Sequence, residues 1–85
     1  MQLDNATIKR LKGIGHELKP IVMIGNKGIT PTITEEIDRA LTDHELIKVK
    51  LPAGTKEERD IVGAELAKAA NASLVHSIGR MALLL

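Results

Sequence analysis

The sequence predicts a small α/β domain in the order α-β-α-β-α-β-β, with helices packed on a mixed four-stranded sheet. Helical patterns with apolar residues every three or four positions alternate with short runs of β-branched residues. Strand–helix–strand units imply a right-handed crossover and parallel pairing of the first two strands. The last two strands are joined by a two-residue turn, which predicts an antiparallel hairpin. The 85 residues are expected to form one domain, 1–85.

The first predicted helix begins after a cap at Asp4 or Asn5 and ends near Leu18. Two glycines, Gly13 and Gly15, weaken it by about 1 kcal/mol each relative to alanine. They either admit the close approach of another backbone or let the helix fray. Its apolar face is formed by Ile8, Leu11, Ile14 or Gly15, and Leu18.

The run Ile21–Ile24 is continuously apolar, which predicts a strand buried on both faces, as in a parallel sheet. A second helix then starts with Thr30 as its N-cap and Pro31 in its first turn. It ends near Asp43 and His44. Its apolar stripe consists of Ile33, Ile37, Ala40 and Leu41.

Alternation over Leu46–Leu51 predicts a strand with one core face and one face open to solvent or a partner. The core face holds Ile47, Val49 and Leu51, and the open face holds Leu46, Lys48 and Lys50.

A capping box of Thr55 and Glu58 starts the third helix, and Asn71 provides a left-handed stop. Strands follow at 73–78 and 81–85, with Gly79 at the first position of the turn between them. The inner side of the helix is predicted to carry Ile61, Val62, Leu66, Ala69 and Ala70.

Composition narrows the functional classes. Hydrophobic residues make up 44% and charged residues 27% of the chain, close to the globular average. No apolar run approaches the roughly 20 residues of a membrane span, and no signal peptide is recognisable, so we expect no membrane contact. The lack of cysteine fits a reducing cytoplasm, which is the expected location, and a monomer is the default expectation. The absence of cysteine excludes disulfides and thiolate sites. The absence of Phe, Tyr and Trp excludes base stacking on aromatic rings.

Charge is nearly balanced overall at +1 but is uneven along the chain. Residues 1–30 carry a net +3, residues 31–45 a net −4 and residues 46–85 a net +2. Such polarity allows a basic face with an acidic back, although a mixed, solvated surface explains it equally well.

Catalysis finds little support in the sequence. The three histidines, His16, His44 and His76, are far apart and lack metal-ligand spacing. The two serines are not in nucleophile-elbow sequences. The acidic pairs 35–36 and 57–58 are expected in first helical turns, where the helix dipole favours them. We therefore expect no catalytic residue, metal site or cofactor, and no enzymatic activity.

The segment Gly25-Asn26-Lys27-Gly28 lies between a predicted strand and a helix start. Ligands tend to bind at the carboxyl ends of strands in α/β sheets. Glycine amides, a helix N-terminus and a lysine can together hold an anion. The spacing differs from that of a nucleotide-binding P-loop. A tight turn with a solvated lysine remains the alternative.

Three stretches carry a family resemblance over residues 11–80: LKGIGHELKPIVMIGNKGIT, HELIKVKL and SIGR. The chain resembles the single-domain bacterial YhbY-like proteins of the CRM family (chloroplast RNA splicing and ribosome maturation). The resemblance implies a fold similar to the C-terminal domain of translation initiation factor 3. It also implies binding of ribosomal RNA in large-subunit precursors through a GxxG loop comparable to that of KH domains.

Carried over to this chain, the GxxG loop is Gly25, Asn26, Lys27 and Gly28, with Thr30 beside it. Without aromatic residues, such a protein should contact mainly phosphates and bind with a strong salt dependence. A protein–protein adaptor on the pre-ribosome, using the acidic segment 31–45, is the alternative. The family's basic surface falls on Lys9, Arg10, Lys12, Lys19, Lys48, Lys50 and Arg80.

Overall fold

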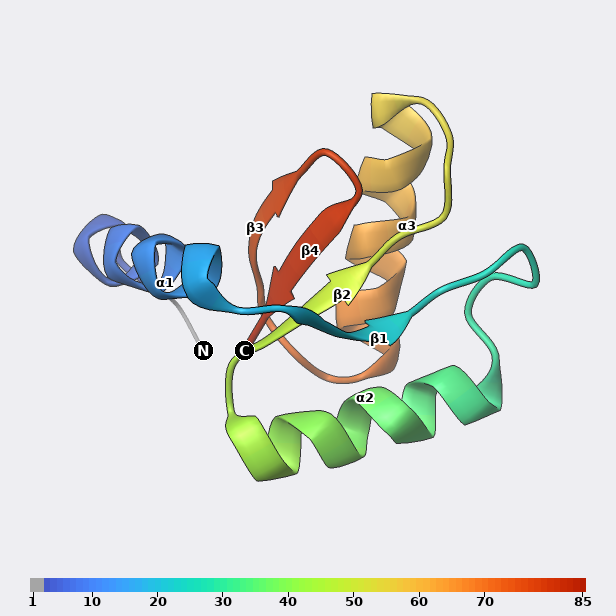
Figure 1. Cartoon of the computed structure of the whole chain (residues 1–85), viewed down its shortest axis with the longest axis horizontal. Coiled ribbons are helices and arrows are strands. Elements are labelled where there is room, and N and C mark those ends of the chain that lie inside the picture. The colour runs from blue at the N-terminus through green and yellow to red at the C-terminus, as the bar shows by residue number, and fades with distance from the viewer. Residues whose placement is uncertain (1–2) are drawn as a thin grey trace.

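A mixed sheet of four strands lies at the centre of the computed structural model, which describes residues 3–85 (Figure 1). The order of helices and strands is the predicted one, and the fold is α+β. No helix in the described part is both long and apolar enough to cross a bilayer. The elements are α1 (Asn5–Glu17), β1 (Pro20–Met23), α2 (Pro31–His44), β2 (Ile47–Lys50), α3 (Lys56–Ala69), β3 (Leu74–Ile78) and β4 (Met81–Leu84).

The strands are arranged in the order β1-β2-β4-β3. β1 runs parallel to β2, and β4 pairs antiparallel with both β2 and β3. The predicted parallel pair and the predicted terminal hairpin are therefore confirmed. Gly79 has a φ of +55° in the hairpin turn, a conformation that favours glycine. Since β1 and β3 are the edge strands, the last strand of the chain lies inside the sheet.

The helices divide between the two faces of the sheet. α2 and α3 cover one face, where the core is made by Ile37, Leu66 and Ala67 from the helices and Ile47, Val49, Leu51, Ala82 and Leu84 from β2, β4 and the residue after β2. Leu83 lies between Ala82 and Leu84 in β4 and so points to the opposite face, where it meets α1. The core and open faces predicted for β2 are confirmed.

α1 contacts the sheet through a glycine. A Cβ atom on Gly15 would lie 2.8 Å from Leu83 Cδ2, and Gly15 is buried. Ile14, the other candidate for this position, is 47% exposed. Gly15 therefore admits a side chain of the sheet, not the backbone that the sequence suggested. Gly13 has nothing within 4 Å of such an atom.

The prediction that β1 is buried on both faces is wrong. Val22 and Ile24 are buried, but Ile21 is 50% and Met23 is 63% exposed. β1 is an edge strand, and α1 packs against β3 at the other side of the sheet, so one face of β1 has no cover. The apolar run is continuous although only alternate residues enter the core.

The N-caps and the left-handed stop that the sequence predicts for the helices are confirmed. The N-caps are Asp4, Thr30 and Thr55, the last in a complete capping box with Glu58, and Asn71 has a left-handed φ of 52°.

Two predictions on the inner side of α3 are wrong. Ile61 is 57% exposed and Ala69 is also exposed, whereas Gly63 and Ala67 are buried. Gly63 faces Leu74 of β3, since a Cβ atom at this position would lie 3.7 Å from Leu74 Cδ2, an ordinary contact distance. The buried stripe of α3 therefore passes through Gly63.

Candidate nucleic-acid interface

The GxxG loop is a tight turn at the carboxyl end of β1. The amide of Gly28 donates to the carbonyl oxygen of Gly25 at 3.0 Å, and Gly28 has a φ of +72°. On the preceding side, the amide of Ile24 donates to Lys50 O at 2.9 Å, which ties the loop to the sheet. Asn26 and Lys27 at the tip are exposed. The loop is thus anchored at its base and open at its tip.

A hollow of about 420 Å³ lies beside this loop, lined also by Thr30, Thr32 and Ile33 at the start of α2. The Oγ1 atom of Thr30 accepts the amide of Ile33 at 3.2 Å, so Thr30 serves mainly as the helix cap. Of the four loop amides, only that of Gly28 has an acceptor among residues 3–85. The remaining three belong to exposed residues and have no acceptor in the described part of the chain, so they are free to donate to a ligand.

No carboxylate occupies the first turn of α2, the helix that begins at this hollow. The expectation that Glu35 and Glu36 lie in that turn is wrong, because Pro31 begins the helix four residues earlier. Glu57 and Glu58 do occupy the first turn of α3. The N-terminus of α2 therefore keeps its partial positive charge for an anionic ligand.

The parallel pairing of β1 and β2 brings further cations to the same end of the sheet. Met23 of β1 is in register with Lys50, and Lys50 with Met81 of β4. Arg80 follows in the hairpin turn, where its Nε donates to Leu51 O at 3.1 Å. Lys50 and Arg80 thus lie at the same end of the sheet as the loop, and the side chain of Arg80 ties the β3–β4 turn to Leu51.

The other predicted basic residues form a second group at the opposite side of the molecule (Figure 1). Lys9, Arg10 and Lys12 are exposed on α1, and Lys19 is exposed just after it. Lys48 lies between the two groups on β2. The predicted site residues therefore surround one face of the sheet and do not converge on one point.

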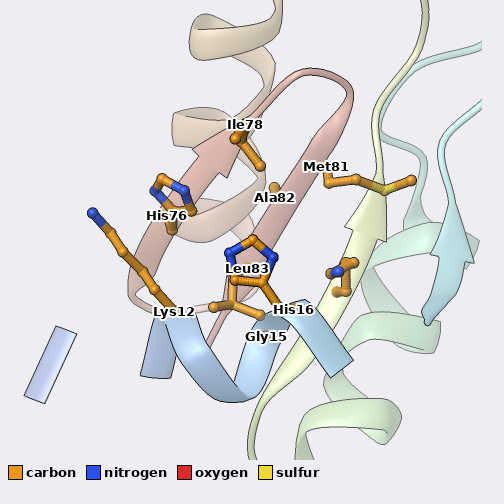
Figure 2. Close-up of a pocket in the computed structure, with 9 residues that line it drawn as sticks. Lys12, Gly15, His16, His76, Ile78, Met81, Ala82 and Leu83 are labelled. Carbon is orange, nitrogen blue, oxygen red and sulfur yellow. The ribbon is translucent and has the colours of Figure 1, made fainter. Parts of the chain in front are cut away.

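Two histidines that are isolated in the sequence come together in the structure. Figure 2 shows Lys12 and His16 of α1 beside His76 of β3, above Leu83. Lys48 also lines this pocket, whose volume of about 30 Å³ suits one water molecule. Desolvation, together with the charges of Lys12 and His16, lowers the pKa of His76 below its ordinary value of 6.5.

The sequence could not reveal this cluster because His76 approaches α1 only when β3 is placed at the sheet edge. The only signal in the sequence that pointed to this place was the strand alternation that put Lys48 on the open face of β2. His44 lies at the end of α2 and does not join the pair. Among residues 3–85, no group of three or more His, Asp or Glu side chains could hold a metal ion.

The sheet separates charges of opposite sign. On one side, α1 carries three cationic residues against Glu17, and Lys48 and Lys50 point the same way from β2. On the other side, α2 carries Arg39 against four carboxylates, those of Glu35, Glu36, Asp38 and Asp43. The polarity predicted from the sequence is therefore a property of the two faces of the fold.

Comparisons with known proteins agree with this arrangement. The family model of the CRS1/YhbY (CRM) domain matches residues 3–85. The chain is 43% identical to a probable RNA-binding protein of Pseudomonas aeruginosa over 83 residues, 98% of this chain and 80% of that protein. It is 38% identical to an RNA-binding protein of Haemophilus influenzae over 74 residues, 87% of this chain and 75% of that protein.

The solved structures include a close match to the fold described above. A solution structure of a hypothetical Staphylococcus aureus protein, thought to bind RNA, superimposes with a TM-score of 0.86 and 29% identity. The superposition covers 98% of this chain and 86% of that one. With the family model matched over nearly its whole length and the fold shared, the chain belongs to the CRS1/YhbY (CRM) domain family.

Proposed function

We propose that this protein binds RNA by its backbone phosphates, using the GxxG loop and the basic side of the sheet. The observation that carries the proposal is the exposed loop with three unpaired amides and Lys27, placed at the end of a cationic sheet face. The names of the Pseudomonas aeruginosa and Haemophilus influenzae relatives support it.

In the proposed complex, one phosphate enters the hollow beside the loop. The amides of Gly25, Asn26 and Lys27 donate to its oxygens, and the Lys27 ammonium adds a full positive charge. The N-terminus of α2 contributes a partial charge of the same sign. A side chain at position 28 would be strained by the φ of +72°, which explains glycine there.

Neighbouring phosphates then follow the cations of the sheet face. Lys50 and Arg80 are nearest to the loop, Lys48 lies farther along β2, and the cations of α1 lie beyond it. Because these groups are spread across the molecule, whose longest extent is 35 Å, the footprint covers several nucleotides.

Structured ribosomal RNA in precursors of the large subunit is the target that we propose, with the protein acting in ribosome assembly as a cytoplasmic monomer. Backbone geometry and shape can be recognised without aromatic stacking, which this chain cannot provide. The resemblance of the GNKG and HELIKVK stretches to YhbY-like proteins supports this choice.

A matched pair of charge reversals tests the proposal. Lys27→Glu in the loop should weaken RNA binding at least tenfold, measured by fluorescence anisotropy at fixed salt. Lys68→Glu makes the same change in net charge on α3 and should leave the affinity nearly unchanged. Both lysines are exposed, so the melting temperatures should stay close to that of the parent. Equal effects of the two changes would contradict the proposal.

A second experiment distinguishes RNA binding from the adaptor alternative. The double variant Asn26→Asp, Lys27→Asp is expected to lose both RNA binding and association with large-subunit precursors in cell extracts. If association persists while RNA binding is lost, the acidic face of α2 becomes the better candidate for the contact surface.

A further inference from the structure

We propose that the open part of the sheet is a binding surface for the nucleobases of single-stranded RNA. The inference rests on the proposed function and assigns a second kind of contact to the same site. Its basis is one row of side chains that crosses all four strands on the side of α1. In register, the row consists of Met23, Lys50, Met81 and Ile78, here called the open row.

The open row leaves apolar surface in water. Met23 is 63% and Ile78 is 62% exposed at the two ends of the row, and Met81 is half-buried between Lys50 and Ile78. The neighbouring row of Lys48, Leu83 and His76 is covered by α1 instead. Figure 2 shows Ile78 and Met81 beyond the end of that cover, toward the hairpin turn. Met81 and Ile78 are neighbours in the row, and Met23 lies beyond Lys50 at the other edge of the sheet. Exposed apolar side chains that share a basic face indicate a contact surface.

The charges around the open row select its ligand. Four cations surround the row. Lys50 lies within it, and Arg80 lies two positions after Ile78 in the hairpin turn. Lys12 and Lys48 line the adjoining pocket. Of the carboxylates, only those of Asp4 and Glu17 belong to α1, the helix on this side, within the described residues. A ligand with flat apolar faces on an anionic backbone matches this mixture, and single-stranded RNA has that character.

The chemistry of the row suits bases in the absence of aromatic rings. The thioethers of Met23 and Met81 are polarisable and contact aromatic rings favourably, and every base offers a π face. Strands lie about 4.8 Å apart, so the four positions span about 14 Å. That length accommodates about two or three bases, the number that a four-stranded sheet of the RNA-recognition-motif type stacks.

The position of the row connects it to the phosphate site. Met23 is separated from Gly25 by Ile24 alone, so the row begins two residues before the loop. The pocket beneath His16 and His76 is small, at about 30 Å³, and adjoins the row through Met81 and Ile78. The bases are therefore placed on the exposed surface of the row.

The test compares a single-stranded oligouridine with an abasic ribose-phosphate oligonucleotide of equal length. The parent protein should bind the base-bearing strand at least tenfold more tightly at the same salt. The double variant Met23→Thr, Ile78→Thr should bind both strands with the affinity that the parent shows for the abasic one. Threonine preserves β propensity, and both positions are exposed, so folding should be retained.

Ile61→Thr is the control, since Ile61 is 57% exposed on α3 at the opposite side of the sheet. It should leave the preference for bases intact. Equal affinity of the parent for the two strands would overturn the inference while leaving phosphate binding in place. Absence of binding to either strand would also overturn the inference, whereas absence of salt-dependent binding to structured ribosomal RNA as well would overturn the proposed function itself. A parent that dimerises through this row, with the double variant monomeric in sedimentation, would assign the row to a second copy and overturn the inference.

Discussion

At the scale of single residues, two glycines in one helix have different roles. Gly15 is buried against Leu83, whereas Gly13 faces open space. Helix propensity alone would treat the two positions alike, at about 1 kcal/mol relative to alanine. The contact of Gly15 with the Leu83 side chain, where the sequence suggested only a close backbone or a frayed helix, gives the two positions opposite effects on stability.

We predict that Gly13→Ala raises the free energy of unfolding by about 0.5–1 kcal/mol, because alanine favours the helix and meets nothing. Gly15→Ala should lower it relative to Gly13→Ala by about 1–3 kcal/mol, since the new Cβ would lie 2.8 Å from Leu83 Cδ2 in a packed contact. Urea unfolding of the two variants measures the difference. Equal stabilisation by both would contradict the packing described for α1.

His76 should make stability depend on pH. Desolvation, Lys12 and His16 hold its pKa below 6.5 in the folded state, so the unfolded chain takes up the proton more readily. Stability should therefore fall as the pH is lowered through about 6.5, and the fall should level off below the folded pKa. In His76→Gln, urea unfolding at pH 7.5 and 5.5 should show a smaller decrease than in the parent. An unchanged decrease would assign the pH dependence to other groups.

At the scale of elements, local signals predicted the ends of the helices well. The capping box of Thr55 and Glu58 and the Thr30-Pro31 start depend on neighbours within four residues, so the sequence contains all the information that they need. The two-face burial of Ile21–Ile24 and the inner position of Ile61 failed for the opposite reason. The first depends on which strand lies at the edge of the sheet, and the second on how α3 packs over β3, and neither is contained in a local stretch of sequence.

Thr30 is expected to act through the helix cap more than through RNA. Thr30→Ala removes the acceptor for the amide of Ile33 and should destabilise the protein by about 1 kcal/mol. Thr30→Ser keeps that acceptor and should retain most of the stability. Thermal unfolding of both variants measures the effect. A full loss of RNA affinity in Thr30→Ser with stability intact would instead assign a direct RNA contact to the threonine methyl group.

At the scale of the whole molecule, the sheet acts as a partition between charges. The sequence showed the acidic segment 31–45, but only the fold places it behind the sheet, away from Lys48 and Lys50. Residues 25–28 were singled out by their position between a strand and a helix, and the family resemblance then assigned them as the GxxG loop. The histidine pair and the open row were not singled out, because the pair comes from α1 and β3 and the row from four strands, which only the fold brings together.

The most direct test of phosphate recognition is the salt dependence of RNA binding. Contact with about four to six phosphates of a single strand predicts that log K falls with log salt at a slope of about −3 to −4. The variant Asn26→Asp, Lys27→Asp should bind more weakly and with a slope shallower by about one. A slope near zero for the parent protein would contradict the account, because an RNA held by phosphates must release counterions when it binds.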